Sequence, residues 1–255
     1  MAKKPVAIQM WTLRDELKNG LSKTLQRAAQ IGYEGVELWF PGPFPPVKEM
    51  KTILAEANLK VAGAHVPLDA MTSDFPRVAD YHREIGNRNL VVPHIPAPRA
   101  RNEDDWKSVV KDLAAVGRKC ADAGFRLAYH NHSIEFEMKV GGIEVHDYIF
   151  SSVPADLLAA ELDTYFIQFV GKNPAQYVRK FSGRVPLLHL KDVSKTPEKY
   201  KNAEIGRGTI DWDSVFKAAE EAGVEWHIVE QNCDEYPTFE SIRMSLDYLK
   251  SKAIA

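Results

Sequence analysis

The chain has few cysteines, almost no net charge and no long apolar run, and each shortage argues against a class of protein. Two cysteines in 255 residues, Cys120 and Cys233, argue against a disulfide framework and favour free thiols in a reducing, cytoplasmic setting. The 33 Lys and Arg residues are balanced by 35 Asp and Glu residues, so the chain lacks the basic character that a nucleic-acid partner usually requires. No stretch approaches the roughly 20 apolar residues of a membrane span, so we expect no membrane partner.

Linkers are also missing from the sequence. No Gly/Ser-rich tract or long run of like charge marks a boundary, so we predict one domain over residues 1–255. The apolar run at residues 6–11 is too short for a signal peptide and is typical of a first strand. The Pro-containing segment 40–46 is too rigid for a linker, and we interpret it as a loop over the site or as a contact within a homo-oligomer.

A helix, a glycine and an apolar strand follow one another repeatedly along the chain. Residues 115–124 precede the strand-like run 127–130, and residues 216–223 precede the run 226–230. Glycine just past a helix supplies the left-handed backbone conformation that ends it. Strands are expected to begin near Val6, Val36, Val61, Leu90, Leu127, Ala159, Val185 and His227, with a last helix from Thr238 to Lys250. Helices that alternate with buried strands predict a parallel α/β sheet.

The alternation fits either a closed barrel or an open, doubly wound sheet. An open sheet of the nucleotide-binding kind usually has a Gly-rich phosphate turn after its first strand. Here residues 9–14 read Gln-Met-Trp-Thr-Leu-Arg at that place. The length of 255 residues is also typical of one (β/α)8 unit. We therefore predict a single (β/α)8 TIM barrel.

Four apolar runs end on, or just before, a residue that can bind a metal ion. These residues are His130, Asp163, His189 and Glu230. Such a group at the end of a buried strand is costly unless it is hydrogen-bonded, paired or bound to a metal. The strands of a barrel converge at their C-terminal ends, so we expect these four side chains to lie together. Their mixed nitrogen and oxygen donors suit one Mn, Co, Fe or Zn ion better than Mg or Ca.

The other strand ends carry polar or aromatic side chains. Trp11, Glu37, His65 and His94 are expected at the same end of the barrel. An aromatic ring such as Trp11 can stack on the apolar face of a sugar, although aromatic residues at strand ends also cap cores. Glu37 is interpreted either as a partner for a substrate hydroxyl or as half of a buried pair with Arg14 or a neighbouring helix residue.

Three further candidates lie just beyond strand ends. Lys191 follows His189 by two positions, so both side chains face the same way if the strand continues. It is interpreted as a partner for a substrate oxygen, or as half of a salt bridge with Asp192 or another carboxylate. His132 is either a group that supports the site or a surface residue. Arg207, between two glycines, is a candidate contact for a substrate anion, although these glycines alone do not indicate a phosphate site.

Six segments together resemble a known family. They are residues 31–38 (IGYEGVEL), 129–136 (YHNHSIEF), 161–164 (ELDT), 187–192 (LLHLKD), 204–212 (EIGRGTIDW) and 228–231 (IVEQ). In combination they resemble the xylose isomerase-like, or sugar phosphate isomerase/epimerase, superfamily of TIM barrels over nearly the whole chain. The resemblance implies one divalent metal ion held by Glu, Asp, His and Glu at consecutive strand ends. By position those ligands become His130, Asp163, His189 and Glu230.

His130 departs from that pattern. The epimerases of the superfamily use the first and last ligand carboxylates as paired acid and base groups, and here only Glu230 is a carboxylate. A histidine bound to metal cannot also accept a substrate proton through the same nitrogen. Two-carboxylate epimerisation is therefore in question, and the His-Asn-His segment is also similar to inosose dehydratases.

The resemblance implies a divalent-metal-dependent sugar isomerase or epimerase that removes a proton next to the carbonyl of a small polyhydroxylated compound. The alternative is a lyase or dehydratase acting on a keto-sugar or keto-inositol. In both reactions Glu230 is the expected base, with Lys191 and His94 as further acid or base candidates. Two other classes share this resemblance: an endonuclease on abasic DNA, which the charge balance argues against, and a sugar-binding barrel without activity, which the departure at His130 would allow.

Overall fold

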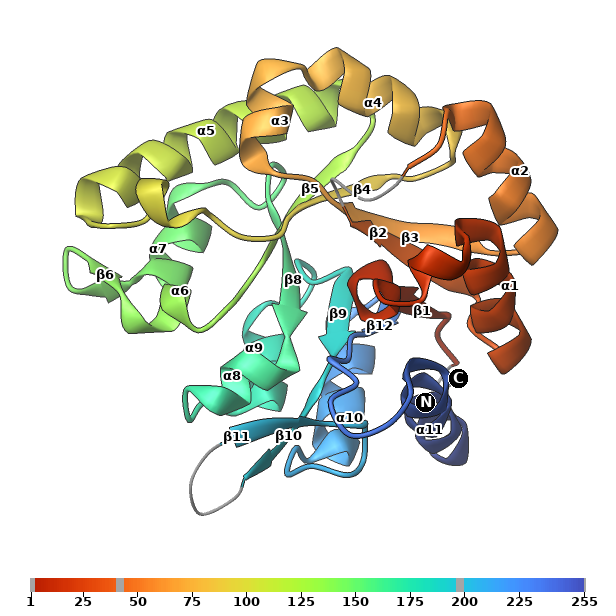
Figure 1. Cartoon of the computed structure of the whole chain (residues 1–255). Coiled ribbons are helices and arrows are strands. Elements are labelled where there is room, and N and C mark those ends of the chain that lie inside the picture. Colours follow the sequence, from red (N-terminus) through yellow and green to blue (C-terminus); the bar gives the residue numbers. More distant parts are fainter. Residues whose placement is uncertain (1–2, 40–43, 196–199, 255) are drawn as a thin grey trace.

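Eight parallel strands close into a barrel with the helices outside it, in a computed structural model that describes residues 3–39, 44–195 and 200–254 (Figure 1). The barrel strands are β1 (Val6–Gln9), β2 (Gly35–Trp39), β3 (Lys60–His65), β4 (Asn89–Val92), β5 (Arg126–His130), β8 (Ala159–Asp163), β9 (Leu187–Leu190) and β12 (Trp226–Val229). They are hydrogen-bonded in the order β1, β12, β9, β8, β5, β4, β3, β2, and the ring closes between β2 and β1. The predicted TIM barrel is confirmed.

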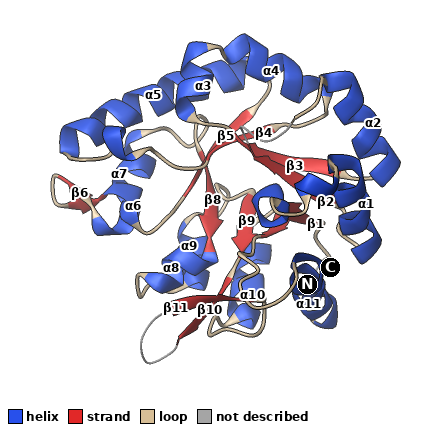
Figure 2. Ribbon diagram, in the orientation of Figure 1, coloured by secondary structure: helices blue, strands red, loops and turns tan. Residues whose placement is uncertain are grey.

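The helices cover the outside of the barrel (Figure 2). They are α1 (Leu21–Ile31), α2 (Val47–Ala57), α3 (Leu68–Ser73), α4 (Phe75–Glu84), α5 (Glu103–Asp122), α6 (Ile134–Glu137), α7 (Val145–Ser152), α8 (Thr164–Phe169), α9 (Pro174–Lys180), α10 (Trp212–Ala222) and α11 (Thr238–Ser251). Gly32 and Gly223 end α1 and α10 in the left-handed conformation, with φ of 118° and 78°, as their positions predicted. Short 3-10 turns occupy Met10–Leu13, Leu17–Asn19 and Ala97–Arg99.

The predicted strand starts lie close to the observed ones. The largest difference is at β9, which was expected from Val185 and begins at Leu187. Pro186 has no N–H to give to a neighbouring strand, and only its carbonyl takes part, by accepting from the backbone N–H groups of Glu225 and Trp226. Two small hairpins were not predicted: β6 (Lys139–Val140) with β7 (Ile143–Glu144), and β10 (Asp192–Lys195) with β11 (Tyr200–Ala203).

The barrel interior is apolar at one level and polar at the next. Seven strands each contribute one residue to a separate apolar cluster: Ala7, Ala62, Val91, Ala128, Ala159, Leu187 and Ile228. Side chains alternate across a strand, so the inward residues of β8 are Ala159, Glu161 and Asp163. On β8 the interior thus changes from a methyl group to two buried carboxylates toward the C-terminal end of the strand.

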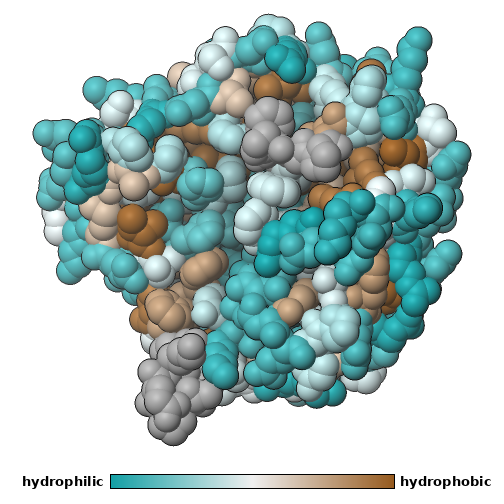
Figure 3. All heavy atoms as spheres, viewed as in Figure 1, coloured by the Kyte–Doolittle hydropathy of each residue, from teal (hydrophilic) through white to brown (hydrophobic). Residues whose placement is uncertain are grey.

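Outside the barrel, the main core lies between the strands and the helices. Most of the face drawn in Figure 3 is hydrophilic, with smaller apolar patches between. Among the described residues, no helix combines the length and apolar character needed to cross a membrane. Cys120 and Cys233 are both free thiols, as predicted. Residues 40–43 lie outside the described residues, so our interpretation of segment 40–46 and the expected homo-oligomer stay predictions.

Candidate active site

The four predicted metal-binding side chains meet at the C-terminal end of the barrel. His130 ends β5, Asp163 ends β8, His189 lies in β9, and Glu230 directly follows β12. Each offers one donor atom, and these four atoms lie within 4.8 Å of one another. All four residues are buried, with the largest exposed fraction, 8%, at Glu230. Residues from four different strands thus form one donor set.

The two oxygens of Asp163 have different surroundings. Oδ1 accepts hydrogen bonds from the backbone N–H groups of Tyr165 and Phe166, at 2.7 and 3.2 Å, and so caps the N-terminus of α8. Oδ2 has no hydrogen-bond partner among the described residues and lies 4.0 Å from Nε2 of His130. A buried oxygen without a partner is costly. Asp163 therefore has one atom that holds a helix and one that is available to a metal ion, and the donor set fits such an ion.

Glu230 is paired with Lys191 across the same end of the barrel. Lys191 Nζ donates to Glu230 Oε1 at 2.7 Å, and Glu230 Oε2 lies 3.1 Å from His189 Nδ1. Burial would raise the pKa of Glu230, but Lys191 and His189 outweigh it and hold the pKa well below its usual range. Burial raises the pKa of Asp163 to about 6, although Lys191 opposes the rise. At neutral pH this end of the barrel holds buried, ionised groups.

Lys191 does not pair with Asp192, which was one of the predicted alternatives. Asp192 instead accepts hydrogen bonds from the backbone of the loop before α10, including Gly206 at 2.9 Å and Gly208 at 3.1 Å, and from Trp212 Nε1 at 2.7 Å. The salt bridge with another carboxylate, the other half of that alternative, is present with Glu230. Because Lys191 also lines the pocket described below, it is both paired and open to a ligand.

A second layer of ionisable side chains lies directly beneath the first. His65 Nε2 lies 2.7 Å and His130 Nδ1 3.0 Å from Oε2 of Glu161, and His189 Nε2 lies 2.6 Å from Oε2 of Glu37. Against the effect of burial, His65 and His189 lower the pKa of Glu37 to about 2. Burial and the Glu37 carboxylate raise the pKa of Glu161 to about 7.

Glu37 was predicted either to hold a substrate hydroxyl or to form a buried pair, and its position supports the second reading. Its side chain is fully buried and does not line the pocket. Its partners are His189 and Gln9, whose Nε2 donates at 2.6 Å, and not Arg14, which donates to the carbonyl of Trp11. The choice of Arg14 was wrong because that side chain turns outward over the Trp11 ring.

Glu161 was not identified from the sequence as a site residue. The available signal was its spacing, because a residue two positions before Asp163 on the same strand faces the same side of the sheet. The apolar neighbours of Glu161 in the sequence hid this signal. Ionisable side chains occupy two successive inward positions on β8, and only the second of them, Asp163, is the last residue of the strand.

A pocket of about 360 Å³ opens above the donor set. It is lined by Trp11, Trp39, His65, Pro67, Pro93, His94, His130, His132, Phe166, Lys191, Glu230 and Asn232. The predicted site residues Trp11, His65, His94 and His132 are thus all at the pocket. Trp11 is 38% exposed and meets Trp39 edge to face, with ring centroids 4.6 Å apart. Burial lowers the pKa of His132 to about 4, so this imidazole is neutral at pH 7.

Arg207 lies away from the pocket, contrary to its predicted contact with a substrate anion. Its side chain is exposed, and its guanidinium carbon stands 5.8 Å from the centre of the Tyr236 ring. The reason is the anchoring of the loop by Asp192, which accepts from the backbone on both sides of Arg207. A contact with a ligand in this pocket is not supported by the position of Arg207.

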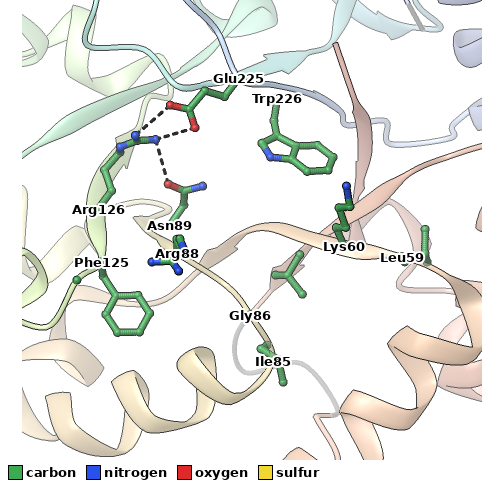
Figure 4. A pocket seen from close by; sticks show the side chains of 12 residues that line it. Leu59, Lys60, Ile85, Gly86, Arg88, Asn89, Phe125, Arg126, Glu225 and Trp226 are labelled. Carbon is green, nitrogen blue, oxygen red and sulfur yellow. Dashed lines mark hydrogen bonds and ion pairs between the residues drawn. The ribbon is translucent and has the colours of Figure 1, made fainter. Parts of the chain in front are cut away.

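The opposite end of the barrel holds a larger cavity of about 670 Å³. Figure 4 shows Arg126 facing Glu225 and Asn89 across it. Arg126 donates to both oxygens of Glu225, at 3.1 and 3.0 Å, and to Asn89 Oδ1 at 3.3 Å. Because these polar groups partner one another, and because barrel enzymes place their chemistry at the C-terminal ends of the strands, this cavity is not the candidate active site.

Comparison with known proteins agrees with this architecture. Residues 25–252 match the family described as xylose isomerase-like TIM barrel. An inosose dehydratase from Clostridium beijerinckii is 26% identical and covers 95% of this chain and 94% of its own. The structure of a sugar phosphate isomerase/epimerase from Parabacteroides distasonis superposes with a TM-score of 0.85 at 25% identity, over 98% of this chain and 95% of that one.

A third comparison concerns a structure with a metal. The IOLI protein with a binding zinc atom superposes with a TM-score of 0.78 at 16% identity, over 96% of this chain and 97% of that one. At this identity the likeness shows a shared fold.

Proposed function

The chain belongs to the xylose isomerase-like TIM barrel family, and on that premise we propose that it is a metal-dependent enzyme that removes a proton next to the carbonyl group of a small polyhydroxylated substrate. We propose further that the reaction continues with loss of water, as in a dehydratase. One observation carries this choice: Glu230 is the one carboxylate among the described residues that line the pocket.

The number of carboxylates at the pocket supports elimination over two-base epimerisation, two reactions that share the first step. Epimerisation at one carbon needs an acid or base group on each face of that carbon. Elimination needs one base for the carbon-bound proton and one acid for the departing hydroxyl. Glu230 and Lys191, 2.7 Å apart, form one such acid–base pair. The similarity to inosose dehydratases supports the same choice.

Four residues would hold the ion in this proposal: His130, Asp163, His189 and Glu230. Two imidazoles and two carboxylates favour Mn, Co, Fe or Zn over Mg or Ca, and the zinc atom in the IOLI structure is consistent with that preference. When bound, a divalent ion supplies positive charge that stabilises a substrate oxygen on which negative charge develops.

Different side chains remove and supply the protons in this reaction. Glu230 accepts the proton from the carbon next to the carbonyl, and the electron pair of that bond forms the enediolate. The hydroxyl on the following carbon leaves as water after receiving a proton, for which Lys191 and His94 are the candidates at the pocket. Trp11 and its partner ring cover the apolar face of the substrate and keep water from it.

An isomerase or epimerase is the second candidate function, and the Parabacteroides distasonis structure is the observation that favours it. In that reaction the proton removed by Glu230 returns to a neighbouring carbon or to the opposite face. His94, at the rim of the same pocket, is then the second acid or base.

Incubation of the metal-loaded protein with an inosose and with a ketose in deuterated water separates the two functions. The proposal expects a product that has lost one water molecule, followed by mass and by the absorbance of the unsaturated ketone. Deuterium in an isomer or epimer, without loss of water, would select the second candidate. If neither compound exchanges its proton or is converted, the proposed first step is wrong for these substrate classes.

A further inference from the structure

Each histidine of the donor set meets a second, deeper carboxylate through its other ring nitrogen. His130 has Nε2 directed toward Asp163, whereas its Nδ1 lies 3.0 Å from Oε2 of Glu161. His189 has Nδ1 beside Glu230, whereas its Nε2 lies 2.6 Å from Oε2 of Glu37. A carboxylate oxygen accepts a hydrogen bond, so the nitrogen that faces the deeper glutamate carries the hydrogen. The other nitrogen of each ring faces the donor set, where its lone pair can bind an ion. His189 Nδ1 lies 3.1 Å from Glu230 Oε2, and Glu161 and Glu37 outweigh burial and raise the pKa of His189 well above its usual range, so an ion bound there replaces a proton on Nδ1.

Short contacts mark hydrogen bonds within the deeper layer. His65, His130, Glu161 and His189 bring donor atoms within 4.8 Å of one another, and two of these residues, His130 and His189, also belong to the donor set above. His65 Nε2 and Glu161 Oε2 are 2.7 Å apart, and His189 Nε2 and Glu37 Oε2 are 2.6 Å apart. They match charge-assisted hydrogen bonds.

The fold is built around the deeper glutamates at some cost. Glu37 and Glu161 are both 0% exposed, and the Oε1 atom of each has no hydrogen-bond partner among the described residues. A Cβ at Gly63 would come within 2.8 Å of Glu37 Oε1, so a glycine makes the room for this carboxylate. The next layer of the barrel is filled by apolar side chains, which lose no hydrogen bonds to water when they are buried. The two glutamates therefore have a purpose other than filling space.

We propose that Glu161, acting through His130, and Glu37, acting through His189, are positioning residues that fix which ring nitrogen each histidine offers to the metal ion. This inference rests on the proposed metal dependence and extends it to residues outside the pocket. Partners of this kind typically affect metal affinity by 10–100-fold when they are removed.

Metal affinity of glutamine variants is the test, because glutamine keeps the shape of glutamate and removes its charge. Zn²⁺ and Co²⁺ are titrated into metal-stripped wild type, Glu161→Gln and Glu37→Gln with a competing chelator. We expect ~10–100-fold weaker binding in both variants and an altered visible spectrum of the Co²⁺ form. Glu204→Gln is the matched control: Glu204 is also buried and accepts from Ser241, away from the donor set, so its binding should equal that of wild type.

A double-mutant cycle tests whether Glu161 acts through His130. In the His130→Ala background, Glu161→Gln should cause a clearly smaller loss of Co²⁺ affinity than it causes alone, whereas independent effects would add in full. The remaining loss reflects the second contact of Glu161, whose Oε2 lies 3.3 Å from His189 Nε2. Glu161→Asp keeps the charge but withdraws it from His130, and it should bind as weakly as Glu161→Gln; it also serves if the glutamine variant does not fold. Circular dichroism of the metal-free proteins monitors folding.

The outcomes separate this inference from the proposed function. Wild-type affinity and an unchanged Co²⁺ spectrum in folded Glu161→Gln and Glu37→Gln would overturn the positioning role and leave the metal site standing. A wild-type protein that binds neither ion would overturn the proposed metal dependence, and the positioning role with it.

Discussion

The two ends of the barrel each hold a cavity, and their polar groups are arranged in opposite ways. At the N-terminal end the space is about 670 Å³, and Arg126 and Glu225 pair there at the surface, with side chains 42% and 52% exposed. At the C-terminal end the space is about 360 Å³, yet Asp163, His189 and Glu230 are buried beneath it. A surface ion pair is inexpensive, whereas buried ionisable groups persist only where something requires them.

The contrast shows that the larger cavity need not be the functional one. A large cavity shows only that side chains leave space unfilled. Buried ionisable groups show that the fold is destabilised at that place, which is expected where those groups have a function. In this barrel the two criteria point to opposite ends. The buried set at the C-terminal end also includes an unpartnered oxygen of Asp163, and the cavity at the N-terminal end offers no equivalent among the described residues.

The largest expected effect is a loss of turnover when Glu230, at the C-terminal end of the barrel, is changed. Glu230→Gln removes the basicity of the proposed base while keeping its shape, so turnover should fall ~100-fold or more, the usual scale for removing a general base. Glu225→Gln at the other end is the matched control and should turn over like wild type. Steady-state kinetics on the metal-loaded proteins measures both. Equal losses in the two variants would mean that the cavities do not differ as described.

A second change tests the deeper polar layer. His130→Glu places a carboxylate beside Glu161, whose oxygen lies 3.0 Å from the present imidazole. Leaving buried charge uncompensated costs about 3–5 kcal/mol, so the free energy of unfolding of the metal-free protein should fall by that order. Adding Glu161→Gln should restore most of it. Urea denaturation measures both variants, and a single variant as stable as wild type would contradict this account.

A third prediction contrasts the site histidines with a histidine elsewhere in the core. His227 is buried, neither ring nitrogen has a hydrogen-bond partner among the described residues, and burial lowers its pKa to about 4. Its neutral form is favoured in the folded state, so its contribution to stability is complete above the unfolded pKa of about 6.5 and is lost as pH falls toward 4. The loss amounts to roughly 3 kcal/mol.

His227→Leu removes that titrating group. The unfolding free energy should then fall less steeply between pH 6.5 and 4, by up to about 1.4 kcal/mol per pH unit, the value for one proton. Denaturation curves across this range provide the comparison with wild type. An identical slope in the two proteins would mean that His227 is not buried in its neutral form.

The smallest expected effect concerns the rim of the pocket. Trp11→Ala removes an exposed aromatic wall, so KM should rise by about 2- to 10-fold with little change in kcat, corresponding to about 0.5–1.5 kcal/mol of ring contact. Arg207→Ala, which removes a side chain outside the pocket, should leave KM unchanged. A larger effect at Arg207 than at Trp11 would show that the loop of Arg207 reaches the substrate.

The C-terminal end of the barrel was predictable where a polar residue interrupts an apolar pattern. His130, Asp163 and His189 each stand at or near the end of such a run, and parallel topology brings strand ends together. Glu161 was less visible, because its significance depends on the barrel being closed, so that inward side chains from opposite strands meet. The sequence pattern identifies which face a side chain occupies, but not which side chain it meets across the barrel.

The sequence pattern also could not predict which carboxylate pairs with Lys191. Lys191 stands next to Asp192 in the chain, yet it pairs with Glu230, 39 residues away. Asp192 is occupied by the backbone of the loop that carries Arg207, and this also explains why that arginine lies away from the pocket. Such pairings depend on where a loop folds back, which no local spacing encodes.

The central claim is that the C-terminal end of the barrel binds a metal ion through a donor atom that nothing else occupies. Asp163→Asn tests it most directly, because asparagine can still cap α8 through its oxygen and replaces only the unpartnered Oδ2. Metal analysis of purified, folded protein should find one divalent ion per chain in wild type and a marked loss in the variant. A variant that retains as much metal as wild type would contradict the account.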